Sequence, residues 1–174
     1  MNESKECEPN QVKNQTNVER KSERELVVTR SFNAPARIVF AAWTTPELLK
    51  RWWMPKSCGV SFISCEADVR TGGTYRFVFG NPSSGEPMAF FGRYIEVIPD
   101  ARLVWTNEEG GEGGAVTTVT FEEHGGETRV TMHDLYPSKE ALDETIASGA
   151  TCGFSETFEQ LDALLEESGR NPIA

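Results

Sequence analysis

The stretch FNAPARIVFAAWTTPELLKRWWMP, residues 32–55, decides the fold of this 174-residue chain. Its first half predicts a short helix that begins at Asn33-Ala34-Pro35, because proline lacks the N–H group that the first turn of a helix leaves unpaired. Apolar side chains then follow at helical spacing, at Ile38, Val39, Ala42 and Trp43. This face of the helix is expected to pack inward.

The second half of the stretch predicts another short helix. Thr45 is a suitable N-cap, Pro46 takes the first helical position, and Pro55 ends the helix. Apolar side chains recur one helical turn apart, at Leu48, Leu49, Trp52 and Trp53. The two helices are expected to form a compact V joined by a two-residue turn.

Strands are predicted on both sides of this helical pair. Residues 25–32, ELVVTRSF, are rich in β-branched side chains and precede it. Beyond Gly59 the pattern alternates, which predicts six further strands, at residues 60–69, 73–80, 88–98, 101–107, 115–123 and 127–135. Short connections rich in Gly, Pro, Asn and Asp separate them, so neighbouring strands are expected to be antiparallel.

A helical pattern returns from Ser138 onward. Its apolar stripe is formed by Phe154, Phe158, Leu161 and Leu165, with an acidic face opposite. Gly149 and Gly153 are unfavourable inside a helix, so we expect either a break near residues 148–149 or a close approach of this helix to the sheet.

Composition predicts one domain, at residues 25–168, between a disordered polar tail, residues 1–24, and a flexible C-terminus, residues 169–174. The net charge of −10 argues against nucleic acid as a partner. No apolar run is long enough to span a bilayer and no signal peptide stands at the N-terminus, so a cytoplasmic protein without membrane insertion is expected. The four cysteines form no C-x-x-C pair, which argues against a zinc or redox site.

Several motifs together resemble the START-like (SRPBCC) superfamily, and within it the family of the C-terminal domain of the heat-shock-protein-90 ATPase activator. They are Trp52-Trp53, DVRTGG at 68–73, Gly92, ARLVWT at 101–106, and Gly153-Phe154. The resemblance implies an α+β helix-grip fold. In that fold a seven-stranded curved antiparallel sheet carries two short helices after its first strand and a long C-terminal helix across its concave face.

The resemblance also implies an apolar cavity between the sheet and the last helix. The side chains expected to line it are Trp43, Trp53, Tyr75, Phe77, Phe79, Phe91, Trp105, Phe121, Met132, Phe154, Phe158 and Leu161. Polar side chains expected to orient a ligand are Arg76, Tyr94, Glu96, Thr118 and His133. Two alternatives stay open: the aromatic residues simply fill a core, and Arg76 and Glu96 form an ordinary salt bridge between neighbouring strands.

Three functions follow from these expectations. The first is a binding module that holds a lipid, sterol, or polyketide- or flavonoid-like molecule. The second is an enzyme of the aromatase or cyclase type, and the third is a partner of a chaperone ATPase. No catalytic residue is assigned, since His133 and Asp134 point to opposite faces of a strand and cannot form a His-Asp couple. No metal ligand or cofactor is assigned either. A monomer or weak homodimer is expected.

Overall fold

The computed structural model describes residues 16–80, 85–109, 113–149, 151 and 153–170. The strands are β1 (Asn17–Arg20), β2 (Glu25–Phe32), β3 (Ser61–Ala67), β4 (Thr74–Gly80), β5 (Met88–Ile98), β6 (Arg102–Thr106), β7 (Val116–His124) and β8 (Glu127–Leu135). The helices are α1 (Ala36–Thr44), α2 (Pro46–Trp52), α3 (Lys139–Ala147) and α4 (Gly153–Arg170), with a 3-10 turn η1 (Lys56–Cys58). This is the predicted α+β helix-grip arrangement.

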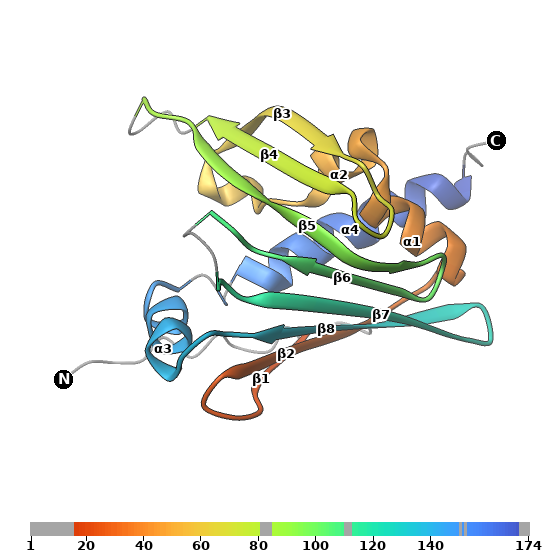
Figure 1. Ribbon diagram of the computed structural model, residues 1–174. Helices are drawn as coiled ribbons and strands as arrows, with labels where there is room; N and C mark the ends of the chain where they lie inside the picture. Colours follow the sequence, from red (N-terminus) through yellow and green to blue (C-terminus); the bar gives the residue numbers. More distant parts are fainter. Residues whose placement is uncertain (1–15, 81–84, 110–112, 150, 152, 171–174) are drawn as a thin grey trace.

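The described strands form one antiparallel sheet in the order β1-β2-β8-β7-β6-β5-β4-β3. Helices α1, α2 and α4 lie across one face of this curved sheet, whereas α3 lies at the end of the sheet where β8 finishes (Figure 1). Alternation of side chains sets which residues face the helices. In β2, for example, Leu26, Val28, Arg30 and Phe32 are buried and the residues between them are only partly buried.

The sheet has eight described strands, so the predicted count of seven is wrong. The additional strand is β1, which pairs antiparallel with β2 from Asn17 opposite Thr29 to Arg20 opposite Leu26. All four side chains of β1 are exposed, so the strand is held by main-chain pairing rather than by burial. Hydrophobic patterning therefore could not reveal it. The expectation of a disordered tail fails for residues 17–20, and residues 1–15 lie outside the described part.

The tryptophan pair fixes the two short helices to each other. Trp52 is buried, and its indole Nε1 donates a hydrogen bond to the Ala42 carbonyl oxygen at 2.9 Å. Thr45 alone joins α1 to α2, instead of the two residues predicted. It takes the N-cap position of α2, but its side chain makes no capping hydrogen bond.

The helical segment at the C-terminus is divided as the glycine positions predict. Helix α3 begins after Ser138, whose hydroxyl oxygen accepts a hydrogen bond from the Ala141 N–H, and it ends before Gly149, whose φ is +79°. Helix α4 starts at Gly153, where an added Cβ would lie only 3.1 Å from the Pro55 side chain. The expected break is therefore found, whereas the close approach at Gly153 is to the segment after α2 and not to the sheet. The helix continues through Arg170, further than predicted.

Helix α4 also holds the segment that follows α2. The Gln160 side-chain amide donates hydrogen bonds to the carbonyl oxygens of Trp52 at 3.1 Å and Met54 at 2.8 Å. Its carbonyl oxygen accepts from the Lys56 N–H at 2.9 Å. One glutamine side chain therefore satisfies three main-chain groups where the chain leaves α2.

Candidate ligand-binding site

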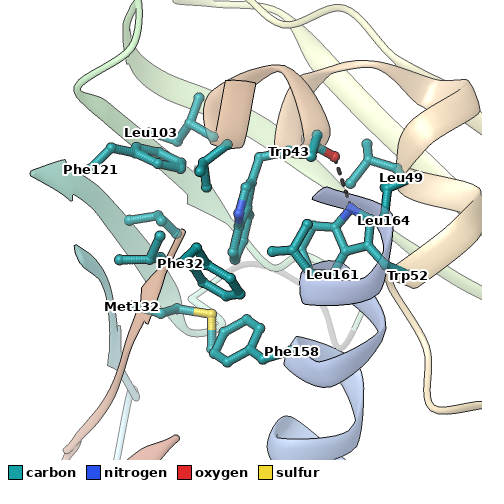
Figure 2. Close-up of a cluster of buried hydrophobic side chains, with 14 of the residues drawn as sticks. Phe32, Trp43, Leu49, Trp52, Leu103, Phe121, Met132, Phe158, Leu161 and Leu164 are labelled. Atoms are coloured by element: carbon teal, nitrogen blue, oxygen red, sulfur yellow. Dashed lines mark hydrogen bonds between the residues drawn. The ribbon is translucent and has the colours of Figure 1, made fainter. Parts of the chain in front are cut away.

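Trp43 stands at the centre of the interior, surrounded by rings from the helices and the sheet (Figure 2). Its ring centroid lies 4.8 Å from that of Trp52, 6.0 Å from Phe121 and 6.2 Å from Phe158. These separations are those of aromatic rings in direct packing contact. The space beneath α4 is therefore occupied by side chains.

Eleven of the twelve predicted ligand-binding side chains belong to this core cluster or pack against it: Trp43, Trp53, Tyr75, Phe77, Phe79, Trp105, Phe121, Met132, Phe154, Phe158 and Leu161. The cavity among them measures about 10 Å³, bordered by Leu49 and Tyr94 among others. That volume is at the threshold for a single water molecule. The described interior is therefore a filled core. Of the two alternatives that the sequence leaves open there, a filled core and a ligand cavity, the structure has the first.

Phe91 is the exception. It is 36% exposed on the outer face of the sheet, where the Arg76 guanidinium carbon lies 5.6 Å from the centroid of its ring. Strand β5 buries Gly92 and Tyr94, so alternation turns Phe91 outward. The expectation that Phe91 and Arg76 face the interior is wrong.

Of the polar candidates, only Tyr94 faces the interior, where burial raises its pKa well above the ordinary value. Arg76 and Glu96 do not pair: Glu96 instead lies 4.0 Å from Arg102 across β5 and β6. His133 Nε2 lies 3.5 Å from a carboxylate oxygen of Glu25 on the outer face. Thr118 sits opposite His133 in the register of β7 and β8 and shares that face.

A larger hollow lies at the α3 end of the sheet, with a volume of about 770 Å³. We call it the α3 cleft. Residues from β5, the β6–β7 connection, β7, β8, α3 and the segments directly after β8 and α3 border it: Phe90, Asn107, Glu109, Gly113, Gly114, Ala115, Thr117, Asp134, Tyr136, Pro137, Ala141, Glu144, Thr145 and Ser148. Its volume falls within the range of about 300–1,000 Å³ that is usual for ligand pockets.

A chain of hydrogen bonds forms one wall of the α3 cleft. The Asn107 side-chain amide donates to Thr117 Oγ1 at 3.0 Å, and the Thr117 hydroxyl donates to Asp134 Oδ1 at 2.6 Å. Thr117 and Asp134 are directly opposite each other in β7 and β8, which is why their side chains meet. The network orients a carboxyl group that is only 8% exposed.

Burial changes the titration of two groups at this wall. It raises the pKa of Asp134 to about 6, against the lowering effects of the Thr117 hydrogen bond and of nearby His133. Burial also raises the pKa of Tyr136 to about 12, with a further contribution from the Asp134 charge. Asp134 therefore changes its charge close to neutral pH, as groups that act in binding or proton transfer often do.

Sequence reasoning missed Asp134 and Thr117, although the signal was present. The alternation that turns Val130 and Met132 inward on β8 also turns Asp134 inward, not His133. On β7 the same rule groups Thr117 with inward-facing Val119, which excludes Thr118. Residue type alone does not separate the inward-facing Thr117 and Asp134 from their outward-facing neighbours Thr118 and His133.

Two further classes of site are not found within the described residues. No group of three or more His, Cys, Asp or Glu side chains there is arranged to hold a metal ion. Within the same part of the chain, no helix combines the length and apolar character needed to cross a membrane.

Solved structures share the fold along nearly their whole length. A protein from Rhodobacter sphaeroides is 26% identical and superposes with a TM-score of 0.79, over 87% of this chain and 98% of its own. Protein Ms6760 from Mycobacterium smegmatis is 27% identical with a TM-score of 0.75, over 88% of this chain and 98% of its own. An AHSA1-like protein from Aeromonas hydrophila shares the fold at 17% identity and a TM-score of 0.64, over 79% of this chain and 93% of its own.

No curated protein matches the chain significantly. The sequence model of one protein family does match it, over residues 33–166. That range runs from the start of the two-helix segment to the last turns of α4, and so includes every described residue that lines the α3 cleft and every element of the core except β2. The chain belongs to the family described as Activator of Hsp90 ATPase homolog 1-like protein.

Proposed function

We propose that this protein binds a small molecule with an apolar body in the α3 cleft. The observation that carries the proposal is a hollow of about 770 Å³ whose wall holds a buried, oriented carboxyl group. Pockets that bind small molecules combine mainly apolar walls with a few fixed polar groups. Here Phe90, Ala115, Pro137 and Ala141 supply apolar surface beside the Asn107–Thr117–Asp134 network.

The proposal differs from the sequence-based expectation in the place of binding. A cavity of about 10 Å³ among Trp43, Trp53 and Phe77 has no room for a lipid or sterol unless these rings move apart. Such movement would open a close-packed aromatic core, and the lost contacts would have to be replaced by the ligand. The α3 cleft needs no comparable rearrangement.

Native mass spectrometry of gently purified protein tests this proposal. We expect a mass beyond the 19.3 kDa chain that disappears on denaturation. Because Ala141 lines the α3 cleft, substituting Ala141→Phe should fill part of it and reduce the bound fraction. Ala147→Phe is the matched control, since Ala147 is exposed on the same helix outside the set of lining residues. Equal retention by both variants would place the ligand elsewhere.

Acid–base chemistry on the bound molecule is a second candidate function. The observation that favours it is a carboxyl group with a pKa near 6, hydrogen-bonded by Thr117 and lying in a cleft. Such a group can exchange a proton at neutral pH. If turnover of a retained molecule is found, Asp134→Asn should abolish it. Unchanged turnover in that variant would exclude Asp134 as the acid or base. Chaperone contact and self-association stay predictions from the sequence.

A further inference from the structure

The charges that border the α3 cleft are of one sign. Its ionisable lining side chains are Glu109, Asp134, Tyr136 and Glu144, and Lys, Arg and His are missing from the described lining set. Of these groups Asp134 is the most buried, at 8% exposed. The sign of the charge therefore favours a cation over an anion.

The second observation concerns the unused bonding capacity of Asp134. Its Oδ1 accepts the hydrogen bond from Thr117, while Oδ2 receives none from the residues that the structure describes. An ionised carboxylate can accept about four hydrogen bonds. Among the described residues, the fully buried side-chain polar atoms without a hydrogen-bond partner are Arg30 Nε and Trp43 Nε1, not Asp134 Oδ2, so this oxygen is accessible. It can therefore accept a hydrogen bond from a donor on a bound molecule.

We infer that the α3 cleft selects a molecule that carries a protonated amine on an apolar body, with the ammonium group donating to Asp134. The inference rests on the proposed function, because it names the class of ligand for the same cleft. The Asn107–Thr117 chain would hold the carboxylate in one orientation, and the side chains of Phe90, Pro137 and Ala141 would contact the apolar body.

The groups that line the α3 cleft from the neighbouring elements are negative or neutral. Arg24, just before β2, donates from Nε to the Tyr136 carbonyl oxygen at 2.8 Å but is not one of the lining residues. Glu109 of the β6–β7 connection and Glu144 of α3 add negative charge at the lining. Thr117 of β7 and Tyr136 after β8 are neutral at pH 7. His133 lies on the opposite face of β8, beside Glu25. A cationic ligand would thus meet Asp134 without an opposing charge among the lining residues.

The pH dependence separates an amine from a neutral ligand. An ammonium group binds the ionised carboxylate, so its affinity should fall as the pH drops through the value at which Asp134 becomes protonated. A ketone or other pure acceptor needs the protonated acid as a donor, so its affinity should rise over the same interval. The sign of the change therefore identifies the class of ligand without knowledge of the natural molecule.

Three probes of nearly equal size test the inference: naphthylmethylamine, naphthyl methyl ketone and naphthoate, titrated calorimetrically into the full chain. We expect the amine to bind most tightly of the three. Its affinity should fall below pH 6, where Asp134 titrates. Asp134→Asn should reduce the affinity for the amine by about 30-fold or more, as expected when one partner of a buried charge pair is removed. Glu122→Gln, which removes an exposed charge at the far end of β7, is the matched control and should leave the affinity unchanged.

The outcomes distinguish the inference from the proposed function. Tighter binding of the ketone or of naphthoate would overturn the amine inference and leave small-molecule binding in the α3 cleft intact. An equal loss of amine affinity in Asp134→Asn and Glu122→Gln would also overturn it, because the attraction would then come from net charge alone. Failure of all three probes to bind would count against both.

Discussion

At the scale of single residues, Asp134 is the side chain on which the proposed function depends. Its carboxyl group is buried in the wall of the α3 cleft with a single described hydrogen-bond donor, Thr117. Burying a charge without full compensation costs stability, and this cost is what raises the pKa. A residue that destabilises the fold yet is held in place by neighbouring side chains is typical of a functional site.

This cost predicts that Asp134→Asn stabilises the protein at neutral pH. A rise of the folded-state pKa from 3.8 to about 6 corresponds to roughly 3 kcal/mol lost on ionisation, and an amide avoids that loss. Because the folded pKa lies above the unfolded one, the wild-type protein gains this stability back as the pH falls from about 6 to about 4. The free energy of unfolding, measured with urea, should therefore be higher for the variant than for the wild type at pH 7, and the difference should disappear near pH 4. A variant that is less stable than the wild type at pH 7 would refute this reading of the site.

At the scale of elements, the joining of β5 to β6 depends on a glycine. A Cβ added to Gly92 would lie 2.0 Å from the Thr106 carbonyl oxygen. The same oxygen accepts a hydrogen bond from the Tyr75 hydroxyl at 2.7 Å. The Gly92 backbone, the Thr106 carbonyl and the Tyr75 phenol are thus packed so closely that no side chain fits at position 92. This explains why a glycine stands in the middle of a long strand.

Gly92→Ala should accordingly destabilise the fold by about 2–4 kcal/mol, through the steric clash and loss of the Tyr75 hydrogen bond. Gly80→Ala provides the control, since a Cβ there would make ordinary contacts with the Ile63 side chain at 3.4 Å and the Ser61 carbonyl oxygen at 3.9 Å. That substitution should cost less than about 1 kcal/mol. Thermal unfolding followed by circular dichroism measures both changes, and similar losses in the two variants would show that the Thr106 contact is not what requires glycine.

Elements that bury one face could be predicted from the sequence, and those held by other forces could not. Strands β2, β4, β7 and β8 alternate between buried and more exposed side chains, so their pattern appears in the sequence. Strand β1 buries no side chain, and nothing in its composition distinguishes it from a tail. The break between α3 and α4 was predictable because Gly149 takes a positive φ that other residues avoid.

At the scale of the whole molecule, the aromatic interior is filled by side chains, whereas the α3 cleft is open. Large apolar side chains at alternating positions, such as those of the predicted ligand residues, mark a core as readily as a cavity. Whether facing layers leave space depends on how side chains from α1, α2 and α4 meet those of the sheet, and single-sequence patterns carry no information on that fit. The α3 cleft was missed for a related reason, because it is built where β8 meets α3.

The most direct test of the central claim is to locate a bound molecule by NMR. Isotope-labelled protein would be titrated with whichever naphthyl probe binds most tightly, and the amide shifts mapped onto the sequence. We predict the largest shifts at Thr117, Asp134, Tyr136 and Thr145, which line the α3 cleft. Shifts concentrated instead around Trp43, Trp53, Phe77 and Trp105 would show that the aromatic interior opens to take the ligand, and would contradict the account.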